Sequence, residues 1–265
     1  MELEITVVDA FTDSVFGGNP AAVIITDEWL SDDLMQSIAS ENNLSETAFL
    51  VLAGTSVYQI RWFSPLTEID FCGHATLASA FVLFDKSPGL TRITFTAQAV
   101  GELIVEKTES GKIQMDFPNT KPQKVSVIPD NLIAGLSIPP VDVYSNSQAY
   151  FVIYESESEV LSVQRNNESL VLLKPLDVVV TCQSEAQEYD FVSRYFWPAN
   201  GGDEDPVTGS IHTGLAPLWA DRLGKKDLVA YQASKRGGVL NCLVSGDRVL
   251  ISGNAVQYLR GVITV

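Results

Sequence analysis

The chain has 265 residues, of which 46% are hydrophobic and 19% charged, as in ordinary globular proteins. It contains 17 lysines and arginines but 33 aspartates and glutamates, which gives a formal net charge of −16. Nucleic acids and anionic membrane surfaces both need a basic face, so this charge argues against either as a partner. The length suffices for one large domain or two small ones, each with a buried core.

Cysteine usage and the first residues indicate a reducing compartment. Cys72, Cys182 and Cys242 are few, odd in number and widely spaced, so they predict no disulfide framework. The opening residues, MELEITVVDAF, lack the cationic start and apolar run of a signal peptide. No apolar segment reaches membrane-spanning length. We therefore expect a cytoplasmic protein.

The first half of the chain is rich in predicted strands. Short runs of β-branched and aromatic residues between turn residues predict strands at 3–11, 20–26, 47–52, 58–64 and 92–98. Ser31 is a suitable N-cap for an amphipathic helix that has two aspartates in its first turn. The apolar face of that helix comprises Leu34, Met35, Ile38 and Ala39.

The segment HATLASAFVLF, residues 74–84, is apolar on all sides. A helix of this kind must be surrounded by other elements. With the strands around it, the segment predicts a strongly curved sheet wrapped around one buried helix.

The chain repeats itself at about half its length. RWFSP at Arg61–Pro65 returns as RYFWP at Arg194–Pro198, and VDAF at 8–11 returns as VDVY at 141–144, both at an offset of 133 residues. Three further echoes link 72–84 with 206–220, 97–105 with 233–243, and 112–115 with 248–251. Five matches in one order at nearly one offset indicate duplication of a whole domain, because solenoid repeats are far shorter.

We place the two halves at residues 1–118 and 130–265, with the last strand free to pack on the first domain. Between them lies PNTKPQKVSVIPD, whose prolines and polar bias are typical of a linker. By repetition, the segment from 206 to 220 predicts a second buried helix at the centre of the second half.

Each predicted buried helix begins at small residues, Gly73–Thr76 in one half and Val207–Ser210 in the other. The first N–H groups of a helix lack intrahelical partners, and the helix dipole makes that end positive. If the two helix starts face each other across a cleft between the domains, they form an anion site suited to a small carboxylic acid. The candidate binding residues are Gly73, Ala75, Thr76, Thr208, Gly209 and Ser210.

Three further residues are candidates for proton transfer. Glu46 lies between the end of a predicted helix and an apolar strand, where desolvation favours the neutral carboxyl and suits it to acid–base work near neutral pH. His74 and Asp205 lie at the two helix starts, where they can hold or relay charge. Structural roles stay open for these residues: a surface acid at Glu46, a capping or core histidine at His74, and a helix cap at Asp205. Ser210 can equally be an ordinary serine in the first turn of the helix.

The acidic loop GGDEDPVTGS at 201–210 does not fit a metal or phosphate site. Counted from Asp203, Asp205 fits the third position of an EF-hand loop, but Val207 and Gly209 occupy the fifth and seventh. Two histidines in the chain leave little for zinc, and no GK[ST] or GxGxxG motif is present. We therefore expect neither a metal nor a cofactor.

The remaining polar residues near these motifs have simpler interpretations. Asp203 and Glu204 are expected to be a solvated or supporting pair, His212 a packed or supporting histidine, and Cys72 a small buried residue. GGNP at 17–20 is predicted to be a hairpin turn, with a reach of Asn19 into the site as the less favoured alternative.

Taken together, the motifs resemble the phenazine-biosynthesis PhzF-like family, whose members are relatives of diaminopimelate epimerase. The matching pieces are FGGNPAAV at 16–23, SETAFL at 45–50, the segment from FSP to EIDFCGHAT at 63–76, EDPVTGS at 204–210 and SKRGGVL at 234–240. They run through nearly the whole chain, and their combination is more specific than any one of them.

The resemblance implies an α+β fold of the diaminopimelate epimerase-like type. It implies two duplicated domains, each with a curved, β-barrel-like sheet around a central helix, a site between them, and usually a homodimer. It also implies a cofactor-independent isomerase that moves a proton on a small cyclic, amino-bearing carboxylic acid. Glu46 would be the general acid/base, and His74, Asp205 and Ser210 would line the site.

Two alternatives remain beside this reading. The second motif has no cysteine to match Cys72, so the two-thiol mechanism of the epimerase relatives is disfavoured, but an epimerase or racemase using a carboxylate and an imidazole is open. Because folds host unrelated functions, a non-catalytic small-molecule binding or interaction protein on the same scaffold is open as well.

Overall fold

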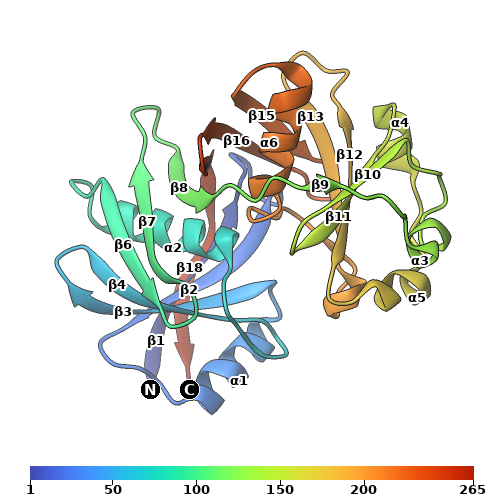
Figure 1. Ribbon diagram of the computed structural model, residues 1–265. Coiled ribbons are helices and arrows are strands. Elements are labelled where there is room, and N and C mark those ends of the chain that lie inside the picture. The colour runs from blue at the N-terminus through green and yellow to red at the C-terminus, as the bar shows by residue number, and fades with distance from the viewer. The chain divides into compact units, whose positions relative to one another are not determined.

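The computed structural model describes residues Met1–Val265, and the chain divides into two compact units (Figure 1). Unit 1 consists of Met1–Asp116 together with Ser252–Val265, and unit 2 consists of Phe117–Ile251. These bounds differ from the predicted halves at 1–118 and 130–265, because the C-terminal segment belongs to the first unit.

The two ends of the chain lie side by side in unit 1 (Figure 1). Strand β18 (Ala255–Thr264) pairs antiparallel with β1 (Glu2–Ala10) along its whole length. The backbone N–H of Val265 donates to the carbonyl oxygen of Met1 at 2.9 Å. Both termini are therefore held by a sheet rather than left to fray.

The proline-rich segment predicted as a linker is part of unit 2. Within it, β9 (Gln123–Lys124) pairs antiparallel with β10 (Asp142–Ser145), and the N–H of Val125 donates to the carbonyl of Val143 at 2.9 Å. The linker prediction is therefore wrong for these residues. Their prolines precede and follow the short strand, where a missing N–H leaves its pairing intact.

The sheet of unit 1 contains two parallel pairs, β2 with β3 and β4 with β6, among antiparallel neighbours. Parallel neighbours need a crossover connection, which helices α1 and α2 provide. The remaining strands of the unit are β2 (Asn19–Thr26), β3 (Glu46–Gly54), β4 (Val57–Phe63), β5 (Glu68–Ile69), β6 (Arg92–Ala97), β7 (Gly101–Lys107) and β8 (Ile113–Pro118), the last of which runs on into unit 2.

Helix α1 (Asp32–Asn42) has the predicted ends and apolar face. The Ser31 hydroxyl accepts the N–H of Leu34 at 3.3 Å, as a helix N-cap does, and Asn43 ends the helix in the left-handed conformation. Met35, Ile38 and Ala39 are buried, in one cluster with apolar residues of β1, β2 and β3.

Helix α2 (Gly73–Lys86) is the predicted central helix of unit 1. It is buried on nearly all sides and packs against β1, β2, β3 and β18. Two of its buried hydroxyls are satisfied within the helix, since Thr76 donates to the Cys72 carbonyl at 2.6 Å and Ser79 to the Ala75 carbonyl at 2.7 Å. The sheet must curve to enclose a helix that has no solvated face.

Unit 2 repeats this pattern strand for strand. Antiparallel β10–β11, parallel β11–β12, antiparallel β12–β13, parallel β13–β15 and antiparallel β15–β16 reproduce the pairing of β1–β2, β2–β3, β3–β4, β4–β6 and β6–β7. The elements are β11 (Ala149–Ile153), β12 (Asp177–Gln183), β13 (Phe191–Phe196), β14 (Glu204–Asp205), α6 (His212–Leu223), β15 (Asp227–Gln232), β16 (Gly238–Ser245) and β17 (Arg248–Gly253). The duplication and the α+β class are confirmed.

The units differ in the connection that corresponds to α1. In unit 2 the crossover from β11 to β12 holds α4 (Glu157–Ser162), α5 (Asn167–Leu170) and the 3₁₀ turn η1 (Val171–Leu173), while α3 (Asp130–Ala134) precedes β10 and the 3₁₀ turn η2 (Pro198–Asn200) follows β13. Figure 1 shows these short helices on the outside of unit 2. No helix of either unit combines the length and the apolar character needed to cross a bilayer.

Gly18 sets the start of β2, and we predict that it cannot be replaced. It has φ +60°, and a Cβ there would lie 2.1 Å from the carbonyl oxygen of Ala10, a backbone atom that cannot yield. Gly18→Ala should lower the free energy of unfolding in urea by about 3 kcal/mol. Gly101→Ala is the matched control, because Gly101 has φ +76° but open space around it, and should lose only about 1 kcal/mol. Equal losses would contradict the steric argument.

Candidate functional site

Glu46 and His74 are in direct contact in unit 1. Glu46 is the first residue of β3, and His74 is the second residue of α2. The Nε2 atom of His74 lies 2.8 Å from Oε2 of Glu46, and the two side chains are only 6% and 14% exposed. Glu46 and His74, both predicted to act in proton transfer, thus form one ion pair. It lies where the start of β3 meets the first turn of α2.

Two more polar groups surround the imidazole of His74. Nδ2 of Asn19, the first residue of β2, lies 3.1 Å from Nδ1, and the sulfur of Cys72 lies 3.4 Å from Nδ1 and 3.8 Å from Nε2. Asn19 is completely buried. The side chain of Asn19 therefore reaches His74, as in the alternative that the sequence favoured less. Only the residues before Asn19 belong to the turn between β1 and β2.

Burial and neighbouring groups set the charges in this cluster. Burial raises the pKa of Cys72 to about 11, so its thiol is neutral at pH 7. Burial alone would lower the pKa of His74, but the Cys72 sulfur and the Glu46 carboxylate raise it well above its ordinary value. At neutral pH the imidazole of His74 is therefore positively charged where it contacts Glu46.

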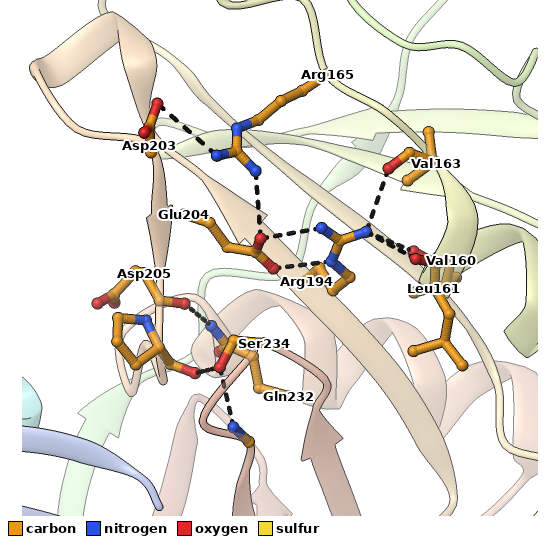
Figure 2. Close-up of polar contacts among 12 residues, drawn as sticks. Val160, Leu161, Val163, Arg165, Arg194, Asp203, Glu204, Asp205, Gln232 and Ser234 are labelled. Carbon is orange, nitrogen blue, oxygen red and sulfur yellow. Dashed lines mark hydrogen bonds and ion pairs between the residues drawn. The ribbon is translucent and has the colours of Figure 1, made fainter. Parts of the chain in front are cut away.

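Asp205 is held by its neighbours in unit 2. It lies in β14, and its carboxylate oxygen Oδ2 accepts the hydroxyl of Thr208. The buried Gln232 donates from Nε2 to the Asp205 carbonyl at 2.9 Å (Figure 2). Its Oε1 accepts the N–H of Thr208, also at 2.9 Å. Gln232 therefore fixes the positions of both residues.

The predicted start of the second central helix is wrong. Residues 209–211 form a turn, and α6 begins at His212 with Ile211 as N-cap. The N–H groups of 212, 213 and 214 bind carbonyls three residues earlier, at distances of 3.1 Å. Asp205 therefore lies too many residues before Ile211, the N-cap, to cap α6. The N–H of Thr208 is not available to a ligand either, because it donates to Oε1 of Gln232.

Ser210 ends a chain of hydrogen bonds, most of them partly buried, that the sequence did not indicate. Its Oγ accepts from Nε2 of Gln148 at 2.9 Å, and the same nitrogen lies 3.3 Å from the hydroxyl of Tyr195. Tyr195 donates to Oδ2 of Asp177 at 2.6 Å, and Asn200 donates to the other oxygen at 2.8 Å. Because Ser210 accepts here, its own O–H is directed elsewhere and can donate to a ligand.

Glu204 is a structural acid rather than a solvated one. Its carboxylate lies 2.8 and 2.9 Å from nitrogens of Arg194 and 3.2 Å from Arg165, and its side chain is 17% exposed (Figure 2). Arg194 also donates to three backbone carbonyls around the end of α4. Asp203 is farther from Arg165, at 3.8 Å, and is largely exposed. The solvated interpretation therefore holds only for Asp203.

His212 is the packed histidine expected from the sequence. It is completely buried, its ring stacks on Phe191 with centroids 6.0 Å apart, and its Nδ1 lies 2.8 Å from the carbonyl of Thr208. Burial lowers its pKa to about 4, so the imidazole is neutral at pH 7 and Nδ1 donates to that carbonyl. This bond secures the loop that carries Asp205.

The predicted site residues thus form two groups. Glu46, Gly73, His74, Ala75 and Thr76 lie together in unit 1, around the start of α2. Asp205, Thr208, Gly209 and Ser210 lie together in unit 2, on the loop before α6.

The family described as phenazine biosynthesis-like protein (PhzC-PhzF) matches residues 8–261. The chain belongs to this family. A relative from Pseudomonas aeruginosa, named an uncharacterized isomerase, is 47% identical over 261 residues, which cover 98% of both chains.

Solved structures agree with this assignment. A PhzF family protein from Enterococcus faecalis superposes with a TM-score of 0.94 at 42% identity, and 100% of each chain is covered. A hydroxyproline epimerase from Agrobacterium vitis shares the fold alone, with a TM-score of 0.56 at 10% identity over 99% of this chain and 92% of that one. The predicted family and the diaminopimelate epimerase-like fold are confirmed.

The ion pair of His74 should make stability depend on pH. Because its pKa is raised in the folded protein, its contribution is complete below about pH 6.5, the ordinary pKa of histidine, and is lost as pH rises through the raised value. The free energy of unfolding of the wild type minus that of His74→Gln should therefore fall between pH 6 and pH 9 in urea titrations. A difference that stays constant over this range would contradict the pair.

His212 should have the opposite dependence. Its folded pKa of about 4 lies below the unfolded value, so the wild type should lose about 3 kcal/mol relative to His212→Asn as pH falls from about 6.5 to about 4. Above pH 6.5 the imidazole is neutral in both states and the difference should be flat, which makes this variant the control for His74→Gln. Equal acid sensitivity of the two proteins in urea titrations would show that His212 is not buried neutral.

Proposed function

We propose that the protein is an isomerase that moves a proton on a small carboxylic acid, cyclic and amino-bearing, without a cofactor. Membership of the family, the isomerase name of a relative 47% identical, and the epimerase-like fold support an isomerase or epimerase type of activity. The observation that carries the finer proposal is the contact of 2.8 Å between Glu46 and His74, at the start of a buried helix.

In this proposal Glu46 moves the proton. Its carboxylate accepts a proton from one carbon of the substrate and returns it to another, so it acts first as base and then as acid. The imidazolium of His74 holds the carboxylate in place through the contact at Nε2 and balances its charge. With so little of either side chain exposed, water competes weakly for the proton.

The remaining candidates bind the substrate. The first N–H group of α2, at Gly73, is suited to a carboxylate because it lies at the positive end of the helix, whereas the N–H of Ala75 is engaged by the Cys72 sulfur. The hydroxyl proton of Ser210 adds a donor, and the carboxylate of Asp205 accepts from an amino group. Thr208 serves this arrangement by holding Asp205, because its hydroxyl and its N–H are both engaged.

Glu46→Gln should abolish proton exchange. With the purified protein and a panel of cyclic amino acids in D₂O, we expect the wild type to incorporate deuterium and the variant to be slower by at least about 100-fold, because an amide cannot accept the proton. Glu41→Gln is the matched control: Glu41 is an exposed acid on α1, and its loss should leave the rate unchanged. A Glu46→Gln protein that keeps the full rate would refute the assignment.

The same experiment separates the alternatives. Exchange with loss of optical rotation would indicate an epimerase or racemase, and binding without exchange would indicate a small-molecule binding protein. The homodimer and the cytoplasmic location that the sequence suggests stay predictions.

A further inference from the structure

Asp177 lies at the buried end of the hydrogen-bond chain that reaches Ser210. Asp177 and Tyr195 are only 8% and 4% exposed, whereas Ser210 is half-buried. We propose that Asp177 is a positioning residue: through Tyr195 and an intervening amide it fixes the hydroxyl of Ser210 as a donor, which prepares the site for a carboxylate. This inference rests on the proposed function, in which Ser210 donates to the substrate.

The direction of the chain follows from the chemistry of its end. An ionised carboxylate only accepts hydrogen bonds, so the Tyr195 hydroxyl, 2.6 Å from Oδ2 of Asp177, has to donate its one proton there. Toward Gln148 the Tyr195 oxygen can then only accept, so the amide presents Nε2, at 3.3 Å, rather than Oε1. The second Nε2 proton goes to Oγ of Ser210 at 2.9 Å, which accepts it. The Ser210 proton is therefore left for a ligand.

Two donors hold the charge of Asp177. Nδ2 of Asn200 lies 2.8 Å from Oδ1, and the Tyr195 hydroxyl occupies Oδ2. The Asn200 amide also has a fixed direction, because its Nδ2 lies 3.3 Å from the carbonyl of Pro175, which only accepts. Burial raises the pKa of Asp177, and these two hydrogen bonds oppose that rise. Burial and the Asp177 charge raise the pKa of Tyr195, so its hydroxyl keeps its proton.

The strands of unit 2 bring the chain to the predicted binding residues. Tyr195 pairs with Val179 of β12 on one side and with Asp205 of β14 on the other. Directly paired residues face the same side of a sheet, and so do residues two positions apart on one strand. Tyr195 therefore shares a face with Asp205 and with Asp177, which lies two residues before Val179. The chain thus lies beside the carboxylate proposed to bind the amino group of the substrate.

The amide of Gln148 is held by its own backbone. The N–H of Gln148 donates to Oδ1 of Asn146 at 2.8 Å, and its carbonyl accepts the N–H of Asp177 at 3.0 Å. The backbone therefore fixes where the amide lies, and Tyr195 decides that its nitrogen rather than its oxygen faces Ser210.

Asp177→Asn should reverse the direction of the chain. The new amide can donate to the Tyr195 oxygen, which frees the tyrosine proton for Oε1 of a turned Gln148, and Ser210 then donates to that oxygen instead of to a ligand. In NMR spectra of the ligand-free wild type, the two Nε2 protons of Gln148 should show nuclear Overhauser contacts to the side chains of Tyr195 and Ser210. The variant should lose them. Their absence in the wild type, or their persistence in the variant, would overturn the assigned direction.

The substrate dependence of deuterium exchange tests the effect on binding. With the substrate found in the panel of cyclic amino acids, Asp177→Asn should raise KM by about 10-fold or more, as expected for a lost hydrogen bond to a charged group, and leave kcat unchanged. The sign is decisive, because removal of a negative charge near an anion site would by itself lower KM. Tyr195→Phe keeps the charge but cuts the chain, so it should also raise KM, and it serves if Asp177→Asn does not fold.

Asp190→Asn is the matched control. Asp190 also lies in unit 2, is 18% exposed, and accepts from Lys225 at 2.6 Å and from the N–H of Val229 at 2.7 Å. Its replacement removes one charge and two hydrogen bonds, as at Asp177, but should leave KM unchanged.

Ser210→Ala should raise KM to the same extent, and adding Asp177→Asn to it should raise KM no further, because both changes remove one donor. A purely structural role of Asp177 would make the two losses add. Additive losses, or a KM that is unchanged or lower in Asp177→Asn, would overturn the inference. A wild type that exchanges no member of the panel, while the NMR contacts behave as expected, would refute the isomerase and still support the direction of the chain.

Discussion

The burial of helix α2 on all sides is the constraint on which unit 1 depends. A helix without a solvated face has to be enclosed, and the sheet curves around it from β1 to β3 and β18. Polar side chains at the start of such a helix are buried with it and have to find partners. Glu46 and Asn19, at the first positions of two adjacent parallel strands, meet this need for His74. The polar cluster is therefore a result of the way the core is built.

The two units show how a duplicated scaffold can diverge at one position. At the repeat offset of 134 residues, His74 corresponds to Thr208. His74 lies inside its helix and forms an ion pair, whereas Thr208 lies before its helix and holds the carboxylate of Asp205. The shift of the helix start to His212 makes room for this loop. The strands therefore pair in the same way in both units, whereas the residues at the starts of the two central helices differ in chemistry.

Much of the fold follows from local patterns, but the pairing of side chains does not. Apolar spacing and repeated motifs predicted strands β1 to β4 and β6 of unit 1, both central helices and the duplication, and the family motifs indicated Glu46 and His74. The link from Ser210 through Gln148 to Asp177 joins residues far apart in the sequence and carries no motif, so only the fold could reveal it. For the same reason the sequence left open whether Glu204 is solvated or supporting, because its arginine partners come from distant segments.

The pairing of β1 with β18 means that an early and a late segment of the chain share one sheet. Unit 2 is contiguous in the chain and can complete its sheet while translation continues. Unit 1 cannot, because its edge beside β1 stays open until β18 has left the ribosome. The N-terminal unit, although it is made first, is therefore the last to close, and until then β1 presents an unpaired strand edge of the kind that chaperones protect.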